Sequence, residues 1–276
     1  MNNSKFGYKT DVGLKRKKNE DSFCAKPEIG VWVVADGIGG NRAGEVASTI
    51  AVEKIARDVK KGVALVDSIE QINTLILQKA DSNPLLSGMA TTIVAMKTEA
   101  NHFEIAWVGD SRAYLWNGKK IQQLTTDHSY VQSLFDNGVI SEKEMSDHPK
   151  RNILTQALGS ENIIKVDFLR GRFNEDEQIL LCSDGLSGTL KDHEIFDILS
   201  NNQSEQVTIE RLIKTAKENG SSDNITAILV SAPENMKLKT LDTTIPIQNK
   251  LNKILWGLIW IVASFIILAL FYNHYW

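Results

Sequence analysis

Residues 31–40 read VWVVADGIGG, and the rest of the chain can be interpreted from this stretch. Its apolar run predicts a buried strand, and Asp36 follows directly at the end of that strand. The arrangement recurs where EIAWVGD ends at Asp110 and where ILLCSD ends at Asp184. A fourth acid, Asp223, opens DNIT just before the apolar run ITAILV. Carboxylates that meet at the rim of a sheet are costly unless cations join them, so the pattern predicts a centre for hard metal ions.

Each of these aspartates also has a plainer explanation when it is taken alone. The glycine-rich turn after Asp36 could connect a strand to a helix or hold a phosphate, although no Lys-Ser/Thr pair follows it as in a nucleotide P-loop. Asp184 could cap a helix, while Asp110 and Asp223 could occupy ordinary turns. All four lie beside an apolar strand, which favours a shared function. Gly37 would let the backbone approach a ligand closely and offer its carbonyl oxygen.

Composition limits the class of protein. The 276 residues suffice for one sizeable core and at most two domains. The content of 42% hydrophobic and 24% charged residues is typical of a globular protein, and a net charge of -3 gives no sign of nucleic-acid binding. Cys24 and Cys182 lie far apart near apolar runs, so we expect two reduced core thiols in a cytosolic compartment.

Residues 1–231 are expected to form one α+β domain. Strands are predicted near 29–35, 91–97, 103–108, 112–116, 178–182 and 225–231, and helices near 42–60, 66–80, 127–137, 191–200 and 204–219. The strands 103–108 and 112–116 are close enough in sequence to form a hairpin. Strands separated by pairs of helices favour a layered α+β domain over a regular βαβ winding.

The C-terminal part has a different character. Residues 232–252 are polar without a clear period and indicate a linker. Residues 254–272 read ILWGLIWIVASFIILALFY, without a charge, and as a helix would span roughly 28 Å, close to the hydrocarbon thickness of a bilayer. We therefore expect a transmembrane helix over 253–273 and a short tail, 274–276. A buried core helix is the alternative, but aromatic residues towards both ends favour the membrane.

Flanking charges predict the orientation of this span. Lysines precede it at 237, 239, 250 and 253, and no Lys or Arg follows. The positive-inside rule then places residues 1–250 in the cytoplasm. The first residues, MNNSKFGYKTD, contain no apolar stretch of the kind found in secretory signals. The expectation is a single-pass membrane protein with a large cytoplasmic domain.

Short motifs occur along residues 7–231 in a characteristic order. They are RKKNED (16–21), DGIGG (36–40), GMATT (88–92), GDSR (109–112), LTTDHS (124–129), HPKRNILTQALG (148–159), SDGL (183–186) and DNIT (223–226). In this order the chain resembles the metal-dependent protein phosphatases of the PPM family, or protein phosphatase 2C, in their bacterial form. Any one motif is weak, whereas the ordered set is specific.

This resemblance implies a four-layer α-β-β-α sandwich of two antiparallel sheets flanked by helices, to which the transmembrane helix is added. It implies hydrolysis of phosphoserine and phosphothreonine in proteins by a water that bridges two Mn²⁺ or Mg²⁺ ions. By position, Asp36 would bridge the ions, Gly37 would lend its carbonyl and Arg16 would bind the substrate phosphate. The remaining metal-site residues would be Glu20 through water, Asp21 beside it, Asp184, Asp223 and, for a possible third ion, Asp110.

Two departures from the family pattern bear on the chemistry. Ile38 stands where many animal members have a histidine proposed as general acid. The leaving group must then be protonated by water, by a metal-bound water or by another residue, with His128 and His148 as candidates. Ala90 replaces a usual glycine in GMATT, and we expect a packing adjustment without loss of chemistry. The stretch 127–158 is expected to contain the flap that borders the cleft.

Partners follow from the same resemblance. We expect a monomer that acts on phosphorylated proteins, such as a Ser/Thr kinase or its substrates, and that binds no nucleic acid. A pseudophosphatase that only binds phosphoproteins would lack metal-binding acids, yet the acids are present. A regulator of anti-sigma-type phosphoproteins is the third hypothesis. Residues 232–276 contain no recognisable sensor domain, which argues mildly against it.

Overall fold

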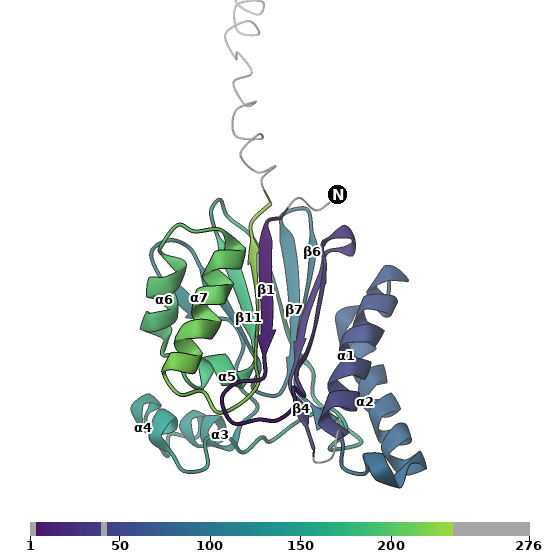
Figure 1. The fold of residues 1–276 in the computed structure, drawn as a ribbon. Helices are drawn as coiled ribbons and strands as arrows, with labels where there is room; N and C mark the ends of the chain where they lie inside the picture. Colours follow the sequence, from purple (N-terminus) through teal and green to yellow (C-terminus); the bar gives the residue numbers. More distant parts are fainter. Residues whose placement is uncertain (1–3, 40–42, 234–276) are drawn as a thin grey trace, which may run out of the picture. The chain divides into compact units, whose positions relative to one another are not determined.

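The computed structural model of the chain describes residues 4–39 and 43–233. Within these residues two five-stranded antiparallel sheets lie face to face (Figure 1). The first sheet contains, in spatial order, β1 (Phe6–Asp11), β12 (Ile225–Ser231), β11 (Gln178–Cys182), β8 (Arg112–Trp116) and β9 (Ile121–Gln123). The second contains β10 (Asp167–Arg172), β7 (His102–Val108), β6 (Ile93–Glu99), β3 (Val31–Ala35) and β2 (Ser22–Lys26). A short ladder pairs β4 (Gly37–Ile38) with β5 (Ala90–Thr91).

Helices cover the outer face of each sheet (Figure 1). The second sheet is covered by α1 (Ala43–Lys60) and α2 (Leu65–Ser82), and the first by α6 (Asp192–Leu199) and α7 (Glu205–Glu218). Shorter helices lie towards one end of the sheets: α3 (Tyr130–Asp136), α4 (Glu142–Asp147) and α5 (Asp184–Ser187). The described residues also contain two 3-10 turns, η1 (Pro27–Ile29) and η2 (Pro84–Leu86).

Three apolar clusters fill the spaces between these layers. Val33 and Ile72 belong to the cluster under α1 and α2, whereas Trp32 and Ile179 belong to the cluster between the sheets. Leu180 belongs to the cluster under α6 and α7. Because successive side chains of a strand point to opposite faces, β3 and β11 are buried on both faces, which explains their unbroken apolar runs. The predicted four-layer α-β-β-α sandwich is confirmed.

The predicted hairpin between residues 103–108 and 112–116 is wrong. β7 pairs with β6 and β10, while β8 pairs with β9 and β11 in the other sheet. The link at residues 109–111 crosses from one sheet to the other, with the Ser111 hydroxyl 2.7 Å from that of Thr92. Closeness in sequence favoured pairing, but each strand hydrogen-bonds to two other strands of its own sheet. The crossing leaves Asp110 at the seam between the sheets.

Other element boundaries differ by small amounts from the prediction. The helix predicted over 127–137 begins only at Tyr130, because Ser129 is its N-cap and accepts a hydrogen bond from the Gln132 amide. The linker, the membrane span and the tail predicted over 232–276 lie outside the described residues, apart from the first two of the linker. Among the helices that are described, none has both the length and the apolar character to cross a bilayer.

Sheet topology brings the ends of four strands to one edge. β3 and β7 both run antiparallel to β6, so they share a direction and both end at this edge. β11 and β12 are antiparallel neighbours, so β12 begins where β11 ends. This geometry explains why three of the aspartates follow their strands while Asp223 precedes its own.

Candidate metal centre

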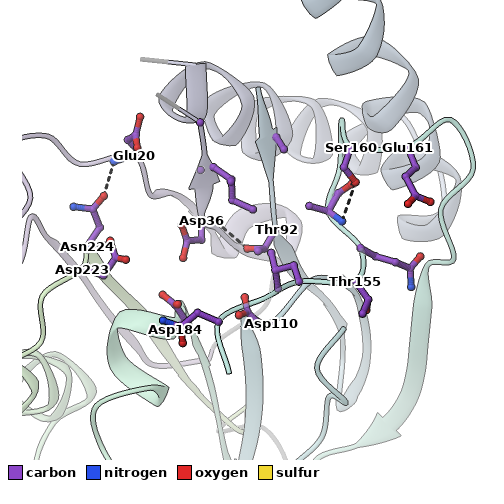
Figure 2. Close-up of a pocket in the computed structure, with 18 of the residues that line it drawn as sticks. Glu20, Asp36, Thr92, Asp110, Thr155, Ser160, Glu161, Asp184, Asp223 and Asn224 are labelled. Atoms are coloured by element: carbon purple, nitrogen blue, oxygen red, sulfur yellow. Dashed lines mark hydrogen bonds between the residues drawn. The ribbon is translucent and has the colours of Figure 1, made fainter. Parts of the chain in front are cut away.

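A cavity of about 770 Å³ opens at this edge of the sheets (Figure 2). Figure 2 shows Asp36 in the middle, Asp110 and Asp184 on the adjacent wall, and Asp223 beside Asn224, which lies between Asp223 and Glu20. The acidic residues that line it are Glu20, Asp36, Asp110, Glu161, Asp184 and Asp223. Arg16 and Gly37 also line it, so the cavity brings together every predicted site residue except Asp21.

The backbone of Asp36 is fixed by two threonines that precede β6. The Asp36 amide donates to the Thr92 hydroxyl at 3.1 Å. Its carbonyl oxygen accepts from the Thr91 hydroxyl at 2.8 Å and from the Thr92 amide at 2.9 Å. The Asp36 side chain is therefore presented to the cavity from a backbone with little freedom to move.

Gly37 allows three segments of backbone to meet beside Asp36. A Cβ atom at this position would lie 2.4 Å from the Gly44 carbonyl oxygen and 2.5 Å from the Glu20 carbonyl oxygen. The Gly37 amide donates to that Glu20 oxygen at 3.2 Å. The close approach requires glycine and holds Glu20 next to Asp36.

Asp110 is positioned through Gly109, whose amide donates to Nδ1 of His128 at 3.1 Å. The other ring nitrogen of His128 lies 3.2 Å from the Asp167 carboxylate. His148 accepts a hydrogen bond from the Lys150 amide at 3.1 Å. Neither histidine lines the cavity, so the contacts of both favour structural roles over protonation of a leaving group.

Asp184 is the first residue of α5, and Ser183 before it connects it to the buried Asp21. The Ser183 hydroxyl donates to Oδ2 of Asp21 at 2.9 Å and accepts from the Thr226 amide at 3.0 Å. Asp21 thus lies beneath the cavity surface and does not line it. Its charge nevertheless acts on Asp36, whose pKa is raised by burial and by this charge.

Asp223 forms an ion pair with Arg16, whose Nη2 lies 2.8 Å from Oδ2 of the carboxylate. The next residue, Asn224, holds both ends of the loop that carries Arg16. Its Nδ2 donates to the carbonyl oxygens of Val12 at 3.0 Å and of Lys18 at 2.9 Å. Its Oδ1 accepts from the Glu20 amide at 2.8 Å. Asn224 was not predicted from the sequence, although DNIT contained it.

Burial and mutual repulsion raise the pKa values of the four most deeply buried acids of this centre, Asp21, Asp36, Asp110 and Asp184. Burial, followed by the charges of Asp21, Asp184 and Asp110, holds the pKa of Asp36 well above its usual range. The pKa of Asp110 rises to about 8 and that of Asp21 to about 7, in both cases mainly through burial. Burial also raises the pKa of Asp184, which shares a hydrogen bond with Asp36. A cation would relieve this repulsion.

The donor set fits hard divalent cations. All of the side-chain donors are oxygens, the preference of Mg²⁺ and Mn²⁺. Oδ1 of Asp21 and Oδ1 of Asp184 are buried without a hydrogen-bond partner. Over residues 4–39 and 43–233, no three acidic, histidine or cysteine side chains already have the spacing of a finished metal site. The carboxylates would therefore rotate when they bind a cation, and Asp223 would exchange its contact with Arg16.

The opposite wall of the cavity comes from residues 152–161, without any predicted site residue. Its lining residues are Asn152, Leu154, Thr155, Gln156, Ala157, Ser160 and Glu161. The flap expected within 127–158 accounts for the first five. Ser160 and Glu161 lie beyond it, and neither periodicity nor charge spacing in this irregular segment could have indicated them.

Comparison with known proteins agrees with this geometry. The sequence profile that matches residues 15–230 is that of protein phosphatase 2C. A curated relative, the serine/threonine phosphatase stp of Listeria welshimeri, is 39% identical over 236 residues, which are 81% of this chain and 94% of the relative. The protein phosphatase PhpP of Streptococcus pneumoniae is 34% identical over 242 residues, 82% of this chain and 96% of its own.

A solved structure shows the same architecture. The catalytic domain of the serine/threonine protein phosphatase PstP, in complex with two manganese ions, superposes with a TM-score of 0.75 at 30% identity. The alignment covers 84% of this chain and 99% of that domain. The fold is therefore shared with a protein phosphatase that binds two manganese ions.

Proposed function

The chain belongs to the protein phosphatase 2C family and is a serine/threonine protein phosphatase; we propose that it hydrolyses phosphoserine and phosphothreonine with Mn²⁺ or Mg²⁺ held by the acids of the cavity. One observation carries the proposal: Asp36, Asp110, Asp184 and Asp223, from the strand ends of both sheets, line one cavity together with Arg16. Repulsion among these acids supplies the free energy that favours divalent cations.

The roles of the residues follow from their positions. Asp36, the Gly37 carbonyl, Asp184 and Asp223 would hold two ions, with Glu20 acting through water and Asp110 serving a third. Asp21 would support the pair from below. When bound, such ions activate a water and neutralise charge on the phosphate. Arg16 on the rim presents a planar guanidinium that can donate two parallel hydrogen bonds to phosphate oxygens.

Protonation of the leaving oxygen is assigned to solvent. Ile38 occupies the position of the animal histidine, and it is partly exposed at the cavity. Among the described lining residues there is no histidine, lysine or cysteine that could donate a proton. The cavity is open to water, which can reach the seryl or threonyl oxygen as it leaves.

Phosphate release from a phosphothreonine peptide tests this function. The full-length chain in detergent should release phosphate only when Mn²⁺ or Mg²⁺ is added, and EDTA should abolish the release. Asp184→Asn removes one charged ligand at nearly constant shape and should abolish it too. Metal-independent activity, or full activity in Asp184→Asn, would contradict the proposed centre.

The domain plan proposed with this function is a phosphatase domain over 1–231, a linker over 232–252 and a transmembrane helix over 253–273. The uncharged stretch 254–272 supports it, as do the lysines that precede the stretch. The enzyme would then act as a monomer at the cytoplasmic face of the membrane, on phosphorylated proteins such as a Ser/Thr kinase and its substrates.

Cell fractionation tests the tether separately from the chemistry. The full-length chain should sediment with membranes, and a 1–233 truncation should stay in the supernatant with its phosphatase activity intact. Protease added to intact cells should leave the catalytic domain whole. Degradation of that domain from outside, or a supernatant location for the full-length chain, would contradict the tether.

A further inference from the structure

A buried asparagine interrupts the apolar face of α2. Leu65, Ile69, Ile72 and Ile76 lie at the helical spacing of a core-facing stripe, and all are fully buried. Asn73 is 2% exposed beside them. Burial of an amide side chain costs free energy unless its polar atoms are hydrogen-bonded, so both polar atoms of Asn73 are expected to have partners.

Both polar atoms of this side chain bind one turn on the wall of the cavity. Oδ1 of Asn73 accepts from the Gly159 amide at 2.7 Å, and Nδ2 donates to the Glu161 carbonyl oxygen at 2.8 Å. The two bonds bracket Ser160. Residues more than eighty positions away in the sequence are thus fixed to α2 by one amide.

The turn fits closely against α2. Gly159 has a φ of +87°, and a Cβ atom there would lie 2.4 Å from Cγ2 of Ile76 and 2.6 Å from the Met89 carbonyl oxygen. Leu158 exchanges two backbone hydrogen bonds with Thr91, at 2.9 and 3.0 Å. The position of this wall is therefore set by two independent contacts, one to α2 and one to β5.

This wall faces the metal-binding acids across the cavity. Figure 2 shows Thr155, Ser160 and Glu161 on the opposite side from Glu20 and Asp223. A volume of about 770 Å³ lies within the range of about 300–1,000 Å³ that holds whole organic ligands, so there is room for more than a phosphate. The wall offers hydroxyl and amide groups suited to a peptide backbone.

We propose that Asn73 is a positioning residue for substrate: by fixing the turn over residues 159–161 to α2, it sets the wall 152–161 along which the polypeptide that flanks the phosphorylated residue would lie. The inference rests on the proposed phosphatase function and deepens it. Asn73 touches no substrate and acts only through the turn. It therefore affects substrates that reach residues 152–161 and has little effect on those that do not.

Hydrogen exchange tests the anchoring without any substrate. In the full-length chain in detergent, Asn73→Ala should raise exchange at the Gly159 amide at least about tenfold, because that amide loses its acceptor. Ser68→Ala is the matched control, since Ser68 is a fully buried polar residue of α2 that bonds Asp58 instead of the turn. Unchanged exchange at Gly159 in Asn73→Ala would overturn the proposal.

A comparison of two substrates tests this wall as a subsite for the peptide. With Mn²⁺, Asn73→Ala should lower kcat/KM for a phosphothreonine peptide about tenfold, mostly through KM, since small misplacements of a binding wall are costly. For p-nitrophenyl phosphate, which has no peptide, kcat/KM should change less than about twofold. Ser68→Ala should leave the ratio between the substrates unchanged.

Gly159→Ala displaces the same turn from the other side and gives a second variant if Asn73→Ala fails to fold. It should shift the substrate ratio in the same direction. Equal losses on both substrates, or an unchanged ratio despite faster exchange at the turn, would overturn the subsite. If the wild-type chain hydrolysed neither substrate, the proposed phosphatase function would be contradicted. That result would be obtained before any variant is tested, so it is distinguishable from failure of the subsite.

Discussion

The two walls of the cavity are built in opposite ways. On the inner wall, Asp36, Asp110 and Asp184 follow strands whose side chains fill the core. Hydrogen bonds donated by backbone amides, to Thr92, His128 and the Thr226 carbonyl oxygen, hold the turns that carry them. The outer wall, residues 152–161, is irregular, and half of its residues are exposed while only Ala157 and Leu158 are buried. The comparison suggests that chemistry is assigned to the rigid strand ends and substrate selection to the irregular segment.

The largest expected effect falls on the inner wall. Asp36→Asn keeps the shape of the side chain but removes the charge that attracts cations, so Mn²⁺-dependent kcat on a phosphothreonine peptide should fall by at least about 10³-fold. Thr155→Ala on the outer wall should change mainly KM. Asp197→Asn, an exposed carboxylate of α6, serves as the control. More than a tenth of wild-type kcat in Asp36→Asn would remove the distinction between the walls.

Arg16 lies at the rim between the walls and should affect binding more than chemistry. Arg16→Ala should raise KM for the phosphopeptide roughly 10–100-fold, and Arg16→Lys should restore only part of this because an ammonium lacks the planar fork. Its ion pair with Asp223 is exposed, so Tm should hardly change. Lys17→Ala tests whether charge alone suffices. An equal effect of Lys17→Ala would remove the special role of Arg16.

Substitution of Asn224 should lower activity less than substitution of Arg16, and the loss should depend on the presence of Arg16. Asn224→Ala removes three hydrogen bonds to the loop over residues 12–20, and each contributes about 1 kcal/mol, so unfolding should become easier by roughly 2–3 kcal/mol. The kcat/KM value should fall about tenfold because Arg16 loses its position. In an Arg16→Ala background most of that kinetic loss should vanish. Additive losses in the double variant would show that Asn224 does not act through Arg16.

The thermal stability of the metal-free chain is also expected to change with pH. The pKa values of Asp21 and Asp110 rise from 3.8 to about 7 and about 8 in the folded chain. Between pH 3.8 and about pH 8 the folded chain therefore binds more protons than the unfolded chain. The free energy of unfolding then falls as the pH rises. With EDTA, Tm should drop by at least roughly 5 °C between pH 5 and pH 8, because each pKa unit changes stability by about 1.4 kcal/mol.

Saturating Mn²⁺ should flatten this dependence on pH. The pKa values of Asp11, Asp58 and Asp167 are lowered, so those carboxylates are already ionised across this window and add no slope. A Tm that rises with pH in EDTA would contradict the repulsion among the buried acids. The same drop with saturating Mn²⁺ would show that the cation does not relieve it.

Much of the inner wall could be predicted from sequence because the pattern that marks it lies within a few consecutive residues. An apolar run marks a strand, and an acid directly after the run marks the sheet edge, so Asp36 and Asp184 were found without a structure. Pairing partners are not local, and the predicted hairpin at residues 109–111 failed for that reason. The mistake did not affect Asp110, since either connection leaves it at a strand end.

The outer wall could not be predicted in the same way. Residues 152–161 have neither helical nor strand periodicity. Asn73 looks like an isolated polar residue on an amphipathic helix until the turn at Gly159 is seen against it. Asn224 lay within a recognised motif, but its bonds to Val12 and Lys18 join residues more than two hundred positions apart. Contacts of this kind are set by tertiary structure alone.

Direct counting of bound Mn²⁺ by electron paramagnetic resonance tests the central claim that acids from both sheets form one metal centre. Free Mn²⁺ gives a sharp signal that is lost on binding, so titration of the metal-free, full-length chain yields the number of sites. We predict at least two ions per wild-type chain and a loss of binding in both Asp36→Asn and Asp223→Asn, which alter opposite sheets. Absence of bound Mn²⁺ in the wild type, or wild-type binding in both variants, would contradict the account.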